Sequence, residues 1–244
     1  MPGSSPRTAD DSGPLTTTIE EGVAVLRFDD GKVNVLSHAA IDAFESALDR
    51  AAADARAVCI VGRDGKFCAG FDLAIMTGEP DGTRRLVSRG AELLMRLYLH
   101  PQPVVVAVTG HALAAGALLV LVCDVRIGAD VPAKIGLNET SIGMPLPQFA
   151  VELARDRLTP ASLARATLAA ETYDPAGALE AGYLDRVVHA DEVVGVAIAE
   201  ANRLGAYRAG AYARTKEVLR RATVDRVEAG TAADMALFTV EAPT

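Results

Sequence analysis

The chain has 244 residues, of which 50% are apolar and 23% charged, so it is long enough and apolar enough for one large domain with a substantial core. Collagen-like and wholly disordered chains are thereby excluded. Its 24 Lys and Arg against 32 Asp and Glu give a net charge of −8, and it has no Trp; this argues against nucleic-acid binding, through phosphates or through stacked bases.

Residues 1–14 are polar and rich in Pro, Gly and Ser. They contain no apolar signal-peptide segment, so we expect a disordered tail on a cytoplasmic protein. The three cysteines, Cys59, Cys68 and Cys123, form no C-x-x-C pair and lie in or beside apolar runs. We interpret them as buried, reduced thiols rather than as a disulfide framework or a zinc site.

Apolar periodicity predicts alternating strands and helices along the chain. Ser37 is the expected N-cap of the first helix, whose Ile41, Phe44 and Leu48 recur on one face. The segments 67–73 and 77–83 are expected to be a loop and a mobile connection. We expect strands at 16–19 and 23–28 (a hairpin), 57–61, 104–108, 125–129 and 186–188, and helices at 41–48, at 84–99, from about 115, and through most of 148–182 and 190–240.

Residues 101–123 contain no Asp, Glu, Lys or Arg, which raises the possibility of a membrane span. Pro101, Pro103 and Gly110 interrupt the stretch, and its β-branched first half differs from its Ala- and Leu-rich second half. A buried strand followed by a buried helix explains this better than a span. The pattern predicts an α/β fold with a sheet covered on both faces, a core at 15–189 and a helical C-terminal region at 190–244.

Several common catalytic motifs are missing from the sequence. There is no P-loop, no dinucleotide-binding G-x-G-x-x-G after a strand, no H-E-x-x-H and no G-x-S-x-G. The four histidines are scattered without metal-ligand spacing. We therefore expect neither a metal nor a separate cofactor, and we interpret the lone His111 as packed rather than catalytic.

Three segments together carry a resemblance to a known family. They are 66–73 (KFCAGFDL), 104–116 (VVVAVTGHALAAG) and 136–145 (GLNETSIGMP). The first follows a buried strand, and the second begins with a strand that leads into a Gly- and Ala-rich turn and a helix. In this order and spacing they resemble the crotonase (enoyl-CoA hydratase/isomerase) superfamily, over about residues 15–240. The resemblance implies a spiral core of ββα units, a helical C-terminal region that forms trimers or hexamers, and an acyl-CoA thioester substrate.

The resemblance also implies a catalytic centre. Two backbone N–H groups would stabilise an oxyanion on the thioester, and they match Ala69 and Ala115. The hydratases of the family carry two glutamates, of which one matches Glu139, whereas the other position is Leu118. Loss of that carboxylate makes the pocket drier, which is expected to raise the pKa of Glu139.

The acyl-CoA-binding set implied by the resemblance is Val33, Lys66, Cys68, Ala69, Gly70, Phe71, Asp72, Leu73, His111 and Ala115. The run that follows the third segment, Met144-Pro-Leu-Pro147, departs from the glycine-rich loop of many members. This stiffer, more apolar loop is expected to reshape the acyl pocket. The cluster Arg214, Lys216, Arg220 and Arg221 is interpreted as a solvated helix face rather than a phosphate site.

One carboxylate suits an enoyl-CoA isomerase, which moves a double bond by taking and returning a single proton. Two alternatives remain open. One is an enoyl-CoA hydratase that recruits its second acid elsewhere, with Asp72 and His111 as the candidates. The other is an acyl-CoA-binding protein without catalytic activity; an interaction protein without a ligand is more distant.

Overall fold

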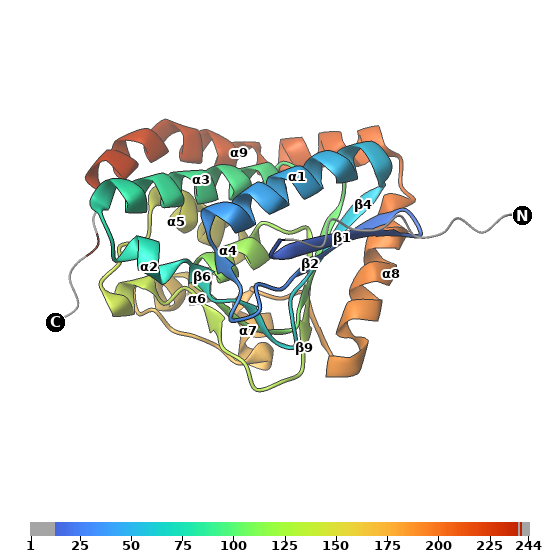
Figure 1. Ribbon diagram of the computed structural model, residues 1–244, viewed down its shortest axis with the longest axis horizontal. Coiled ribbons are helices and arrows are strands. Elements are labelled where there is room, and N and C mark those ends of the chain that lie inside the picture. Colours follow the sequence, from blue (N-terminus) through green and yellow to red (C-terminus); the bar gives the residue numbers. More distant parts are fainter. Residues whose placement is uncertain (1–12, 239, 241–244) are drawn as a thin grey trace, which may run out of the picture.

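The computed structural model of the chain describes residues 13–238 and residue 240. Its centre is a six-stranded sheet in the order β1-β2-β4-β7-β9-β11 (Figure 1). Strands β1 and β2 form the expected antiparallel hairpin, and the other neighbours are parallel. The strands are β1 (Leu15–Glu20), β2 (Val23–Phe28), β4 (Ala57–Val61), β7 (Val104–Val108), β9 (Val125–Ala129) and β11 (Arg186–Val188). Residues 1–12 of the expected tail lie outside the described residues.

Both faces of this sheet are covered, as its continuous apolar strands predict. Successive side chains of a strand point to opposite faces. Thus Cys59 and Val105 pack toward helix α8, while Ile60 and Val106 belong to the larger core on the other face. The helices are α1 (His38–Asp54), α2 (Leu73–Met76), α3 (Pro80–Tyr98), α4 (Ala115–Leu121), α5 (Gln148–Arg157), α6 (Pro160–Thr167), α7 (Pro175–Ala181), α8 (Val193–Gly205) and α9 (Ala209–Leu237).

Several local predictions are confirmed. The Ser37 hydroxyl accepts a hydrogen bond from the Ala40 amide, capping α1, and Ile41, Phe44 and Leu48 are fully buried. The three cysteines are free and buried. The uncharged stretch 101–123 forms strand β7, a short strand and helix α4. In the part of the chain that the structure describes, no helix combines the length and the apolar character needed to cross a membrane.

Two predictions about connections are wrong. The segment 67–73 is largely not a loop, because it contributes to β5 (Gly65–Cys68), β6 (Gly70–Phe71) and the start of α2. Strands of two to four residues are too short to show an alternating pattern of apolar and polar residues. The connection expected at 77–83 ends early, since α3 begins at Pro80; proline suits the first helical position because it needs no N–H there. The remaining short elements are β3 (Val35–Leu36), β8 (Gly110–Leu113), β10 (Ile135–Gly136) and the 3₁₀ turns η1 (Glu139–Ile142) and η2 (Ala190–Glu192).

The cationic cluster on α9 is only partly solvated. Arg214 and Arg221 are exposed, as expected. Lys216 and Arg220 instead bind the two carboxylate oxygens of the buried Asp124, at 2.6 and 2.8 Å. These two side chains lie one turn apart on the face that α9 turns to the core. They therefore anchor α9 rather than meeting phosphate groups in solvent.

Candidate active site

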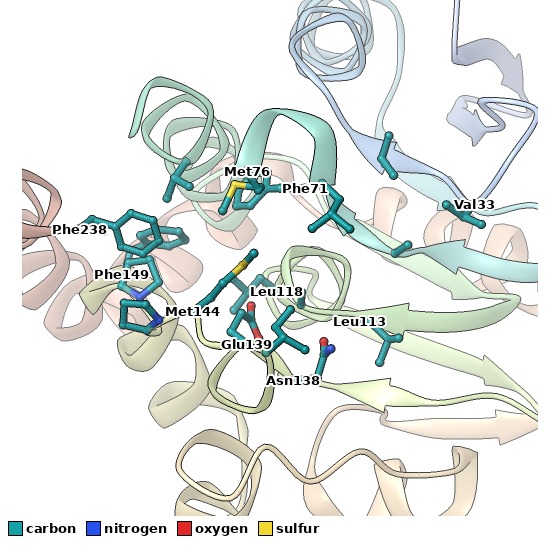
Figure 2. A pocket seen from close by; sticks show the side chains of 18 residues that line it. Val33, Phe71, Met76, Leu113, Leu118, Asn138, Glu139, Met144, Phe149 and Phe238 are labelled. Atoms are coloured by element: carbon teal, nitrogen blue, oxygen red, sulfur yellow. The ribbon is translucent and has the colours of Figure 1, made fainter. Parts of the chain in front are cut away.

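A cavity of about 280 Å³ lies where β6, the start of α4, η1 and the residue after α9 meet (Figure 2). Of the 18 side chains that line it, only those of Asn138 and Glu139 are polar. The lining residues are Val33, Val35, Ala69, Phe71, Leu73, Met76, Val87, Leu113, Ala114, Leu118, Asn138, Glu139, Ile142, Met144, Pro145, Pro147, Phe149 and Phe238. The stiff loop 144–147 thus forms part of the wall, as the sequence predicted.

The cavity has an open and a closed end. Figure 2 shows Val33 at one end, Glu139 in the middle, and Phe149 with Phe238 at the other end. Val33 is 41% exposed and Leu73 is 59% exposed, whereas Phe149 is fully buried and Phe238 is 6% exposed. A long apolar ligand can therefore enter past Val33 and lie across Glu139 with its tail toward the two phenylalanines (Figure 2).

Among the described residues that line the cavity, Glu139 has the only ionisable side chain. It is the first residue of η1 and is buried, and its Oε2 atom has no hydrogen-bond partner among the described residues. Burial raises the pKa of its carboxyl group to about 7, because the charged form is poorly solvated there. A buried carboxyl group with such a pKa is suited to exchanging protons with a ligand near neutral pH.

Leu118 faces the same cavity as Glu139, as its spacing from Ala115 predicted. Its side chain is 2% exposed and lies next to Glu139 in Figure 2. Leu118, which the resemblance matches to the second carboxylate of the hydratases, thus contributes an apolar side chain to the cavity. The high pKa of Glu139 agrees with the drier pocket that we expected from this replacement.

Gly116 allows the start of α4 to approach strand β5 closely, and Ala114 precedes it in an unusual backbone conformation. A Cβ atom on Gly116 would lie 2.1 Å from the Cys68 carbonyl oxygen, so no larger residue fits without moving the backbone. Ala114, the residue before α4, has φ 52° and ψ −127°, a strained conformation for a residue with a side chain. This geometry leaves the Ala115 amide at the first helical position, where it has no hydrogen-bond acceptor among the described residues.

The other expected N–H donor, Ala69, is already engaged. Its amide donates to the carbonyl oxygens of Asn34 at 2.9 Å and of Val33 at 3.2 Å. In this structure it is therefore not free to meet a ligand oxygen, and its assignment as an oxyanion donor is corrected. The side chain of Ala69 still lines the cavity.

The N–H of Phe71 is the better placed donor. Strand β6 pairs with β3 alone, and the Asp72 amide donates to the Leu36 carbonyl of β3. Because successive N–H groups of a strand point to opposite sides, the Phe71 N–H points away from β3. A Cβ atom on the neighbouring Gly70 would lie 3.4 Å from the Ala115 amide nitrogen, so the two amides are close.

The remaining predicted binding residues divide into two groups. Val33 and Leu73 line the cavity with Ala69, Phe71 and Glu139. The expected residues that do not line it are Lys66, Cys68, Gly70, Asp72, His111 and Ala115, of which Gly70 and Ala115 contribute backbone close beside it. A role for Lys66 toward the coenzyme A part of a ligand, outside the cavity, stays a prediction.

Asp72 and His111 have structural partners instead. The Asp72 carboxylate caps α2 by accepting a hydrogen bond from the Ala74 amide at 3.0 Å. The His111 Nδ1 atom accepts a hydrogen bond from the Lys134 amide at 2.9 Å, which agrees with its interpretation as a packed residue. Neither supplies a second acid to the cavity. In the described part of the chain, no cluster of His, Cys, Asp or Glu is arranged to hold a metal ion.

Three residues that shape the site were not predicted from the sequence. Asn34 is fully buried, and its side-chain amide holds the Phe28 and Phe67 carbonyl oxygens, which fixes the loop before β3. Asn138 places a second unpartnered buried oxygen in the cavity, and its position next to Glu139 was the available signal. Phe238 closes the far end, and no local pattern indicated this.

Comparisons with known proteins agree with this geometry. A family model described as enoyl-CoA hydratase/isomerase matches residues 18–242. Human mitochondrial enoyl-CoA delta isomerase 1 is 33% identical over 222 residues, which are 89% of this chain and 74% of that protein. The 2,3-dehydroadipyl-CoA hydratase of Escherichia coli is 30% identical over 86% of this chain and 83% of its own length.

The same family is found among solved structures. The crystal structure of an enoyl-CoA hydratase/isomerase family protein from Pseudomonas syringae matches with a TM-score of 0.90 and 40% identity, over 93% of this chain and 98% of that one. The crotonase-like α/β fold expected from the sequence is thereby confirmed. With a family model that spans most of the chain and relatives that match over most of their own length, this chain belongs to the enoyl-CoA hydratase/isomerase family of the crotonase superfamily.

Proposed function

We propose that the chain is an enoyl-CoA isomerase, which converts a 3-enoyl-CoA into the conjugated 2-enoyl-CoA. The observation that carries this proposal is Glu139, the single ionisable side chain among the described residues that line the cavity. Moving a double bond requires one proton to leave C2 and one to arrive at C4. A single carboxylate that reaches both carbon atoms can do both, and no water takes part.

The reaction begins when the Glu139 carboxylate takes a proton from C2 of the bound 3-enoyl-CoA. The electron pair of that C–H bond moves into the thioester and leaves a dienolate with negative charge on the thioester oxygen. The protonated Glu139 then returns the proton to C4, and the double bond forms between C2 and C3. Glu139 ends as the carboxylate with which it began, so the cycle needs no further reactant.

The negative oxygen of the dienolate needs hydrogen-bond donors fixed in advance. We assign this role to the amides of Ala115 and Phe71. Ala115 has the free amide at the start of α4, and Phe71 presents its amide on the open side of β6. The strained Ala114 and the tight contact of Gly116 with Cys68 hold the two amides close together.

The main alternative, hydration of a 2-enoyl-CoA, needs a group that holds and activates water besides the proton donor. Neither candidate for that group, Asp72 or His111, lines the cavity, and Leu118 is apolar. Binding without catalysis is disfavoured by the buried carboxyl group of Glu139, whose Oε2 atom has no hydrogen-bond partner among the described residues, because its desolvation costs free energy that packing alone does not require.

The proposal is tested by supplying purified protein with a 3-enoyl-CoA and following the absorbance of the conjugated product, beside hydration of the matching 2-enoyl-CoA. We expect double-bond migration at least about 100-fold faster than hydration, since loss of a general acid or base typically costs about 10²- to 10⁴-fold. Faster hydration than isomerisation would support the hydratase. Binding of acyl-CoA with neither reaction would support the binding protein.

Leu118→Glu is expected to increase hydration of a short 2-enoyl-CoA above the wild-type rate. The new carboxylate would project beside Glu139, where it can hold water. The gain is expected to be partial, because a second buried acid raises the pKa of at least one carboxyl group. The measurement is loss of the conjugated absorbance with time. Leu118→Gln, which is polar but cannot accept a proton, is the matched control; equal gains in both variants would contradict a role for the carboxylate.

Assembly and location stay predictions. We propose that the chain forms a homotrimer or hexamer through its C-terminal helices, in the cytoplasm. The exposed apolar side chains of Val218 and Leu219 on α9, which are 56% and 72% exposed, support an assembly through this helix.

A further inference from the structure

We propose that Phe238, the residue after α9, forms the end of the acyl-chain pocket and thereby limits the length of the acyl chain that the protein accepts. This inference rests on the proposed function and adds a substrate range to it. Phe238 is 6% exposed, and it lines the closed end of the cavity with Phe149, at the opposite end from Val33 (Figure 2). The limiting residue thus comes from the C-terminal helical region, far along the chain from Glu139.

The end of α9 is attached to the start of α5 beside this wall. The Gln148 amide donates a hydrogen bond to the Asp234 carboxylate at 2.8 Å, and the Gln148 side chain donates to the Arg226 carbonyl oxygen at 2.8 Å. A Cβ atom on Gly230 would lie 1.8 Å from the Gln148 Oε1 atom, so glycine permits this approach. Phe149 follows Gln148 directly, and Phe238 lies one turn beyond Asp234. These contacts fix the positions of the Phe149 and Phe238 rings.

An acyl chain gains affinity with length only while each added methylene is buried. Burial of one methylene contributes about fourfold to a binding constant. Apart from Asn138 and Glu139, which lie away from this end in Figure 2, all the described lining residues are apolar, so the described part of the closed end offers no polar opening. A chain whose tip reaches the Phe238 ring gains nothing from further carbon atoms unless the ring moves. The structure therefore predicts a break in affinity at a defined chain length.

The experiment measures binding of saturated acyl-CoA thioesters of increasing even chain length by calorimetry, which does not depend on isomerase activity. For the wild type we expect affinity to rise and then to stop rising at one length. Phe238→Ala should move this break to a longer chain and increase affinity for the first thioester beyond the wild-type break by on the order of tenfold, the effect of about two further buried methylenes. Shorter chains should bind as before.

Four further variants distinguish an effect on the pocket wall from general damage to the fold. Met235→Ala removes a buried side chain from the same end of α9 that does not line the cavity, so the break should stay in place. Asp234→Ala should move the break in the same direction as Phe238→Ala. Asp234→Asn can still accept the hydrogen bond from the Gln148 amide, so its break should stay at the wild-type chain length. Phe238→Trp keeps a large ring and should move the break to a shorter chain.

The outcomes distinguish this inference from the proposed function. An unchanged break in both Phe238→Ala and Phe238→Trp overturns it, as does a wild type whose affinity rises steadily through long chains. If Phe238→Ala does not fold, the shift in Phe238→Trp decides. If the break moves as expected but the protein does not catalyse double-bond migration, the role of Phe238 in limiting chain length is supported and the proposed isomerase activity is refuted. Absence of binding at every length would overturn both.

Discussion

Glu139→Gln is expected to lower the rate of double-bond migration by about 10²- to 10⁴-fold. The amide has nearly the shape of the carboxyl group but cannot accept the C2 proton. In the proposed complex the apolar wall holds the acyl chain and backbone amides hold the thioester, so the affinity for saturated acyl-CoA should change little. The measurement is kcat for a 3-enoyl-CoA together with the calorimetric binding constant.

Glu152→Gln is a matched control for this variant, since Glu152 is also buried but does not line the cavity. It should keep the wild-type rate. A Glu139→Gln protein that isomerises at the wild-type rate would refute the single-carboxylate mechanism. A loss of acyl-CoA affinity equal to the loss of rate would instead assign Glu139 to binding.

The pH dependence of the wild type follows from the same carboxyl group. Because the base is the deprotonated form and its pKa is raised to about 7, kcat/KM should rise with pH and level off above neutrality. Stability should change in the opposite sense. Because its pKa is raised, Glu139 is buried more favourably when protonated. Its contribution to the free energy of unfolding is therefore fully present below the unfolded-state pKa of 4.5 and is lost as the pH rises through the folded-state pKa of about 7.

Glu139→Gln removes this dependence. The unfolding free energy of the variant minus that of the wild type should therefore be about 3 kcal/mol larger at pH 8 than at pH 4, since each unit of pKa shift corresponds to about 1.4 kcal/mol. Thermal unfolding of both proteins at the two pH values checks this, with a difference of several degrees expected for a chain of this size. The same difference at both pH values would show that Glu139 titrates normally.

Ala115→Pro is expected to lower kcat by about 10²- to 10³-fold, the usual effect of removing one oxyanion donor. Proline has no N–H, and Ala115 occupies the first position of α4, where proline is tolerated because its amide has no partner within the helix. The loss should appear mainly in kcat, since the dienolate carries more negative charge on the thioester oxygen than the bound substrate does.

Ala115→Gly retains the amide and is the control, which should keep a rate within a few fold of the wild type. The ring of proline restricts the preceding residue, and Ala114 is already strained. An ester in place of the Ala114–Ala115 amide removes the N–H without adding a ring. Full activity in this ester variant would exclude Ala115 as an oxyanion donor.

The sequence by itself determined the elements whose pattern repeats locally. Ser37 and the apolar face at Ile41, Phe44 and Leu48 were enough to place α1, because a helix brings every third or fourth residue to one face. The continuous β-branched strands predicted a sheet covered on both sides. The same helical spacing placed Leu118 on the cavity that Ala115 adjoins, and the motif around Glu139 identified the carboxylate.

Only the tertiary structure decided which backbone amides are free and what closes the pocket. The Ala69 N–H donates to the Asn34 carbonyl oxygen, and the Phe71 N–H points away from β3. Both follow from the pairing of this segment with the one around β3, and not from the identity of Ala69 or Phe71. Phe238 reaches the cavity because α9 is bonded to α5. Local patterns arise from backbone periodicity, whereas these features arise from contacts between segments far apart in the chain, which no local pattern encodes.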